Sequence, residues 1–243
     1  MKSITIILIS VISGAIAGLI LAGMNMLIVE PLIDKAIEIE TSNAMNSGEN
    51  VDMDEHILTR TWQKSGSFIA GALLGGAFGS VLGIVYLFIY KTVSVSNDRK
   101  NAILLSLVMC AVLFVIPFLK YPGNPPAVGN PETIYYRETL YVGFLAVSSI
   151  TALGVGILYY KLKDKYDHLN IVVPLVYFGI IGLAFIVFPS NPDGISISMD
   201  LVNSFRIATG VTMVLFWAIL GISFGLLWQK LQPFQPSSKR ITL

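Results

Sequence analysis

Six apolar runs, each long enough or nearly long enough to cross a lipid bilayer, constrain the fold of this chain more than any motif. A transmembrane helix needs about 20 predominantly apolar residues, and the candidate runs cover residues 4–29, 66–90, 102–119, 139–160, 170–188 and 207–228. Charged residues make up 13% of the chain, against about 25% in soluble domains, and the mean hydropathy is +0.73. The sequence therefore predicts an all-α polytopic integral membrane protein, with about six transmembrane helices arranged as three hairpins in the lipid bilayer.

Basic residues are distributed unevenly among the segments that connect these runs. Alternate segments hold ten of the sixteen Lys and Arg residues, namely Lys2, Lys91, Arg99, Lys100, Lys161, Lys163, Lys165, Lys230, Lys239 and Arg240. The other segments carry twelve of the fifteen acidic residues. Because Lys and Arg in short loops stay on the cytoplasmic side, we expect a multi-pass protein of the cell membrane with both termini in the cytoplasm.

This orientation predicts one transmembrane domain, 1–243, with outer loops at 30–65, 120–138 and 189–206 and a cytoplasmic tail at 229–243. A basic inner face suits anionic lipid headgroups. We therefore expect no nucleic acid among the partners.

The segment FLKYPGNPPAVGNPETIYYRE, residues 118–138, is rich in proline and must form a stiff outer loop. Proline removes a backbone donor and fixes φ, so no helix can pass through this segment. YPGNPP at 121–126 aligns with FPSNPD at 188–193, which suggests a repeated two-helix unit. The aligned prolines and asparagines are candidates for shaping an entrance: Pro122, Asn124, Pro125, Asn191 and Pro192.

An arginine precedes the second helix of each predicted hairpin, at Arg60, Arg137 and Arg206. Each arginine could belong to a feature shared by the three hairpins, or it could simply be a long side chain that reaches the lipid headgroups.

Glycines at four-residue spacing predict faces for close helix packing, because they let two backbones approach. They are Gly71, Gly75, Gly79 and Gly83 in the second run, Gly14 and Gly18 after Ser10 in the first, and Gly221 and Gly225 in the sixth. The spacing leaves open whether each face packs within one chain or between chains.

Several mechanisms lack the residues that they need. The six runs contain no Asp, Glu, Lys, Arg or His, so intramembrane charged relays have no candidates. The chain has no GxxxxGK[ST], HExxH or CxxC motif, and its single cysteine, Cys110, allows no internal disulfide. We therefore expect neither an enzyme nor a permanently bound cofactor.

The polar chemistry lies in the predicted outer loops. Glu30, Asp34 and Glu38 recur at four-residue spacing around Pro31, so a short helix would place three carboxylates on one face. Such a helix could lie at the membrane interface with a solvated acidic side, or its carboxylates could attract a divalent cation. In the second case the imidazole of His56 would favour a transition metal, although a lone interfacial His is also a common hydrogen-bonding residue.

The sequence resembles the predicted cobalt transporter subunit family CbtA. The resemblance rests on EPLIDKAIEIE, HILTRTWQKSG, residues 118–138, FPSNPDG and NSFRIAT, and it extends over nearly the whole chain. It implies a membrane subunit for uptake of cobalt or a related divalent transition metal, linked to cobalamin supply, with a small histidine-bearing subunit, CbtB, as partner and Co²⁺ as the transported ion. The hypothetical metal-receiving residues are Glu30, Asp34, Glu38, His56 and Glu132. The alternative is a non-transporting accessory subunit of an oligomer or larger membrane complex.

Overall fold

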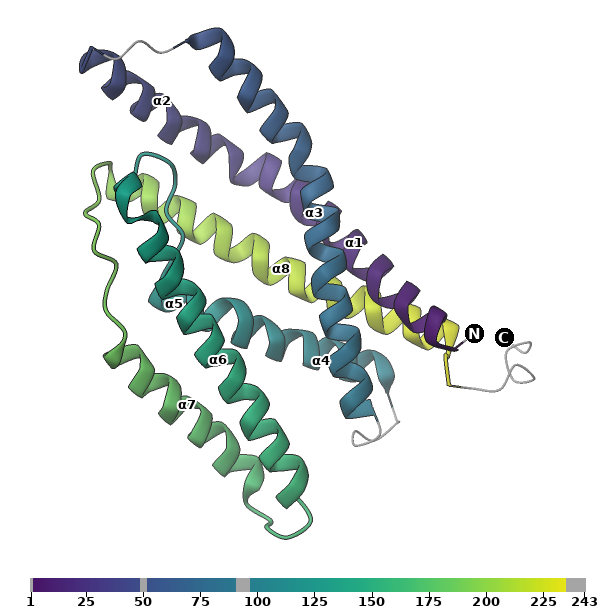
Figure 1. The fold of residues 1–243 in the computed structure, drawn as a ribbon. Coiled ribbons are helices and arrows are strands. Elements are labelled where there is room, and N and C mark those ends of the chain that lie inside the picture. Colours follow the sequence, from purple (N-terminus) through teal and green to yellow (C-terminus); the bar gives the residue numbers. More distant parts are fainter. Residues whose placement is uncertain (1, 49–51, 91–96, 235–243) are drawn as a thin grey trace. The chain divides into compact units, whose positions relative to one another are not determined.

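The computed structural model describes residues 2–48, 52–90 and 97–234, and within these ranges the chain is helical with no β-strand (Figure 1). Six helical segments are long and apolar enough to cross a membrane, which confirms the predicted all-α polytopic fold. The α-helices are α1 (Lys2–Ile28), α2 (Glu30–Asn46), α3 (Met53–Tyr90), α4 (Asp98–Cys110), α5 (Ile116–Lys120), α6 (Ile134–Leu162), α7 (Leu169–Val187) and α8 (Met199–Leu231). Two shorter elements are a π-helical turn, η1 (Ala111–Val115), and a 3-10 turn, η2 (Pro131–Thr133).

The helices extend beyond the apolar runs, so the predicted outer loop 30–65 is largely helical rather than irregular. Hydropathy marks the part of a helix that lipid can surround, whereas backbone hydrogen bonds continue through polar residues. The 38 residues of α3 span about 57 Å at 1.5 Å per residue, against about 30 Å for the hydrocarbon core. Its first turn is capped by Asp52, whose carboxylate accepts from the backbone N–H groups of Asp54 and Glu55.

The proline-rich segment contains no helix between Lys120 and Pro131, as predicted from its composition. Three residues of the charge argument, Lys91, Lys239 and Arg240, lie outside the described residues, as does part of the predicted tail, 235–243.

The chain forms two compact units, which we describe separately. The first comprises Met1–Met109 and Ile207–Leu243, and the second comprises Cys110–Arg206. Of the helices in the third predicted hairpin, α7 belongs to the second unit and most of α8 to the first. The expectation of one domain over 1–243 stays a prediction.

In the first unit, α1 and α3 pack with their backbones in contact (Figure 1). A Cβ atom added at Gly18 would overlap the carbonyl of Gly71, and one at Gly14 would overlap the carbonyl of Gly75. Gly79 and Gly83 approach Ser10 in the same way. The glycine faces of the first two spans therefore meet each other within one chain.

The glycines of the sixth span have a different neighbour, helix α4. A Cβ atom at Gly221 would lie 2.7 Å from that of Ser106, and one at Gly225 would lie 2.9 Å from the Cα of Arg99. The buried Ser106 hydroxyl donates to the carbonyl of Trp217 at 2.5 Å. Close approach and one interhelical hydrogen bond thus join α4 to α8.

In the second unit, α6 packs against α7 and against the π-helical turn η1. Phe144, Tyr177, Ile181 and Ala184 form the buried core between α6 and α7. The third span is not one continuous α-helix, because η1 interrupts it between α4 and α5.

We expect the same substitution to have opposite effects at two glycines of α1. Gly18→Ala should lower the free energy of unfolding by about 1–3 kcal/mol, because the new methyl group would meet the backbone of α3. Gly23→Ala, where nothing lies within 4 Å, should stabilise the helix by up to about 1 kcal/mol. Thermal unfolding of the purified protein in detergent measures both, and equal shifts of the midpoint would contradict the packing described.

Candidate functional site

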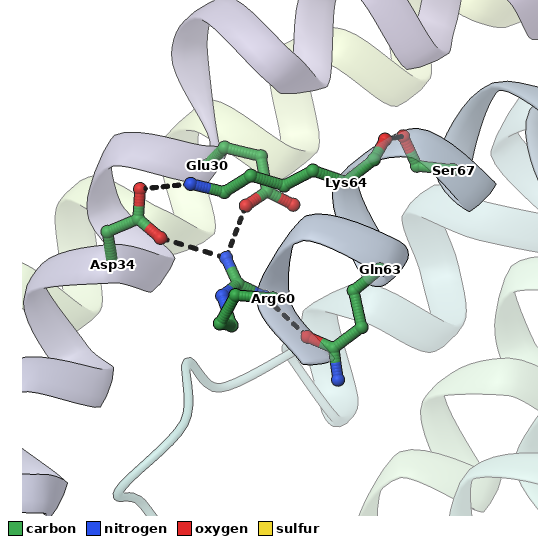
Figure 2. A network of polar contacts seen from close by, with 6 residues as sticks. All are labelled: Glu30, Asp34, Arg60, Gln63, Lys64 and Ser67. Carbon is green, nitrogen blue, oxygen red and sulfur yellow. Dashed lines mark hydrogen bonds and ion pairs between the residues drawn. The ribbon is translucent and has the colours of Figure 1, made fainter. Parts of the chain in front are cut away.

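Helix α2 follows α1 after a single intervening residue, Val29, which itself has helical dihedral angles. Pro31 lies in the first turn of α2, where its missing N–H costs nothing. The helix runs for 17 residues, longer than the short helix predicted, and its apolar face buries Ala36 completely. The carboxylates of Glu30 and Asp34 face the N-terminal part of α3 (Figure 2).

An ion network joins α2 to α3 (Figure 2). The Nη2 atom of Arg60 lies 2.5 Å from Glu30 Oε2 and 2.9 Å from Asp34 Oδ1. Lys64 Nζ lies 2.7 Å from the other carboxylate oxygen of Asp34, and Arg60 Nη1 donates to Gln63 at 2.7 Å. We call these five residues the α2–α3 ion network.

The two cations also set the protonation state of Asp34. Partial burial alone would raise the pKa of this carboxyl group, but hydrogen bonds and charge attraction from Lys64 and Arg60 outweigh it. The pKa of Asp34 is consequently lowered from its ordinary value of 3.8. The carboxylate is therefore charged at neutral pH, and each of its oxygens is bound by one cation of α3.

Beyond the network, a pocket of about 290 Å³ is lined by residues from the later part of α2 and the first turn of α3. Its polar lining includes three of the predicted metal-receiving residues, Asp34, Glu38 and His56. Two thioethers that sequence reasoning did not place here, Met45 and Met53, also line it. The pocket thus offers oxygen, nitrogen and sulfur donors, a mixture that suits a borderline transition-metal ion.

The other two predicted residues lie elsewhere. Glu30 pairs with Arg60 and does not line the pocket. Glu132 belongs to η2 in the second unit, and its side chain is exposed. Among the described residues, no group of three or more His, Cys, Asp or Glu side chains is placed to hold a metal ion.

The second unit contains another polar cluster, formed by two proline loops. We define the first proline loop as residues 121–130 and the second as residues 188–198. The Tyr121 hydroxyl donates to the carbonyl of Pro189 at 2.5 Å, and Ser196 donates to the carbonyl of Ala127 at 2.7 Å. The loops predicted to be repeats therefore bind each other.

Two arginines complete this contact reciprocally. Arg206, which follows the second proline loop, donates to Asn124 of the first loop at 2.7 Å. Arg137, which follows the first loop, has its Nε 2.9 Å from Asp193 Oδ2 of the second. Each arginine thus reaches the loop of the other repeat, so protein groups bind all three predicted interface arginines.

Asp193 is the functional candidate that sequence reasoning missed. Its side chain is only 6% exposed, and besides Arg137 it accepts hydrogen bonds from the Asn130 N–H and the Thr133 hydroxyl. One difference between the aligned repeats could have identified it. At their last position, FPSNPD has Asp193 where YPGNPP has Pro126.

Gly129 makes room for this buried ion pair. Its φ of +103° favours glycine, and a Cβ atom there would lie 2.6 Å from Arg137 Nη1 and 2.8 Å from Asp193 Oδ2.

A pocket of about 320 Å³ opens beside the two loops. The predicted entrance residues Pro122, Asn124 and Asn191 line it together with Arg137 and Glu138. The predicted Pro125 and Pro192 are not among its lining residues. The amide oxygens of Asn124 and Asn191 already accept from Arg206 and from the N–H of Asp193, so these side chains hold the loop geometry.

Residues 3–229 match a family described as "Probable cobalt transporter subunit (CbtA)". No curated protein and no solved structure matches the chain. The match covers both pockets and all six spans, and it confirms the resemblance inferred from the sequence.

We expect the α2–α3 ion network to survive mild acid. Since the pKa of Asp34 is lowered in the folded state, its contribution is fully present above pH 3.8 and is lost as the pH falls through the lowered value. Spin labels at Glu40→Cys and Asp54→Cys, in a Cys110→Ser background, should report one interhelical distance from pH 7 down to about pH 4. Asp34→Asn should widen this distance already at pH 7, and a transition centred above pH 5 would contradict the assignment.

Replacing Asp193 should destabilise the loop contact strongly. Asp193→Ala leaves the half-buried Arg137 without its ion-pair partner and removes the acceptor of Asn130 and Thr133, so it should lower the free energy of unfolding by about 1–3 kcal/mol. The control is Asp200→Ala, an exposed acid in the first turn of α8, which should cost less than about 1 kcal/mol. Limited proteolysis of residues 188–198 and thermal unfolding measure the difference between the two variants. Equal effects of the two substitutions would contradict the role given to Asp193.

Proposed function

This chain belongs to the CbtA family of probable cobalt transporter subunits, and from that premise we propose that it is the membrane subunit of an importer for cobalt or a related divalent transition metal. The observation that carries the proposal is the family match over residues 3–229, in a chain whose described part has six helices able to span a membrane. We further propose that both termini are cytoplasmic and that the α2–α3 pocket faces outward. The imported metal would be used for the synthesis of cobalamin.

Cation capture is assigned to the α2–α3 pocket. Within the described part of the chain, Arg60 and Lys64 ion-pair with Glu30 and Asp34, whereas Glu38 forms no ion pair. Glu38 and His56 are therefore the donors that an arriving cation would meet first. Carboxylates raise the local concentration of a cation, and imidazole prefers transition metals to magnesium or calcium.

A tightly bound ion needs more ligands than these two side chains supply. The family description calls its members subunits, and we propose that a small histidine-bearing membrane subunit like CbtB provides the remaining ligands. Incomplete coordination on this chain also suits transport, because an ion held by few ligands can leave again.

Asp34 links the capture of a cation to the contact between α2 and α3. Both of its oxygens are bound by cations of α3, and it also lines the pocket. A divalent ion that recruits this carboxylate must displace Arg60 and Lys64, which loosens α2 from α3. We propose that this exchange couples arrival of the ion to movement of the two helices.

Uptake of labelled cobalt by cells tests the proposal, with the chain expressed alone and with a small histidine-bearing partner. His56→Ala and Glu38→Gln should each raise the KM for cobalt at least about tenfold, since each removes a ligand. Glu40→Gln is the matched control, because this exposed acid of α2 does not line the pocket. Nickel and zinc serve as competitors.

Wild-type uptake in both pocket variants would remove the pocket from the mechanism. If the inserted wild-type chain drives no uptake in either setting, the importer proposal fails and the accessory subunit takes its place. That alternative predicts copurification with a large membrane complex.

A further inference from the structure

The interruption of the third span lies next to Pro117. In η1 the N–H of Ile116 donates to the carbonyl of Ala111, five residues earlier, instead of to Val112 as in an α-helix. The next donor that Val112 could use belongs to residue 117, and proline has none. The carbonyl of Val112 is therefore left without a backbone partner inside an apolar span.

A hydroxyl group from another helix replaces the missing donor. Ser148 of α6 is completely buried, and its hydroxyl donates to Val112 O at 2.7 Å. The hydroxyl of Tyr177 of α7 lies 2.9 Å from Ser148 Oγ. Because Ser148 uses its proton on Val112, Tyr177 is the donor to Ser148. One polar chain thus connects the third, fourth and fifth spans.

Pro117 leaves one carbonyl without a backbone donor in either of two helical registers. In the π register that carbonyl belongs to Val112, whereas in an α register Ile116 would donate to Val112 and the carbonyl of Leu113 would be the orphan. The α register leaves one orphan carbonyl, whereas the π register leaves that of Val112 and a second one where the helix returns to bonds between residues four apart. The hydroxyl aimed at Val112 O offsets part of this cost and thereby favours the π register. A proline alone does not impose the π register, since α7 contains Pro174 and remains α-helical.

We propose that the third span is a two-register switch, and that Ser148, positioned by Tyr177, holds it in the π register. Conversion to the α register would turn α4 against α5 by about 100°, the rotation of one residue. The chain passes from the first compact unit to the second between Met109 and Cys110, at the start of η1.

Cys110, the single cysteine, reports on the register. It immediately precedes η1 and is 3% exposed, so a rotation of the helix would carry it away from its buried face. The rate of its reaction with a membrane-permeant maleimide, in full-length protein in lipid nanodiscs, measures the switch. Labelling is normalised to the total thiol after denaturation.

Ser148→Ala should raise the labelling rate roughly fivefold or more, since it leaves Val112 O buried without a donor. Pro117→Ala should raise it as well, because the restored N–H can serve either register, so the hydroxyl of Ser148 is no longer needed and the intrinsically favoured α register prevails. Ser148→Thr, which keeps the hydroxyl group, should label like the wild type. The matched control is Ser149→Ala, whose hydroxyl donates only within α6, to Leu145 O.

Wild-type labelling rates in both Ser148→Ala and Pro117→Ala would overturn the proposal. An equal rise in Ser149→Ala would also overturn it, because the effect would then be a general loosening of α6. The readout involves no metal, so the result does not depend on whether the chain imports cobalt.

Discussion

Lipid supplies no hydrogen-bond partner for the peptide backbone, and the rest of this structure depends on that constraint. In the described part of the chain, helices satisfy most of the backbone of the apolar runs, and the two irregular proline loops lie between spans rather than inside one. At the π-helical turn in the third span, Ser148 supplies the donor that Pro117 removes. The interruptions of helical hydrogen bonding described here thus either lie outside the spans or receive a hydrogen bond from a side chain.

The sequence was informative about the fold wherever a pattern is local. Apolar run length located all six spans, and four-residue glycine spacing located faces that lie in helix contacts. Neither pattern identifies a partner, because a groove of glycines accepts any close backbone. The pairing of α1 with α3 and of α8 with α4 required the structure. The π-helical turn was hidden for the same reason, since Ser148 is distant from Val112 in sequence.

The candidate site shows the same limit. Helical spacing predicted that Asp34 and Glu38 share one helical face, and both side chains line one pocket. It could not show that Arg60 and Lys64, 26 and 30 residues after Asp34, bind the Asp34 carboxylate. A count of charges treats Asp193 as one more acid of the predicted outer loops, whereas its burial, its ion pair with Arg137 and its hydrogen bonds from Asn130 and Thr133 make it the centre of the loop contact. Long-range pairing, rather than residue type, separates bound carboxylates from available ones.

The reciprocal arginines also fix an order of assembly during synthesis. A membrane chain emerges from its N-terminus, so α1 and α3 can pack as soon as the second span is complete. Asn124 must wait for Arg206, which lies 82 residues later in the chain, and Arg137 must wait for Asp193. The first proline loop therefore remains without its partners through the insertion of two further spans. A chain truncated before the last span would therefore lack Arg206, and Asn124 of the first proline loop would have no partner from that helix.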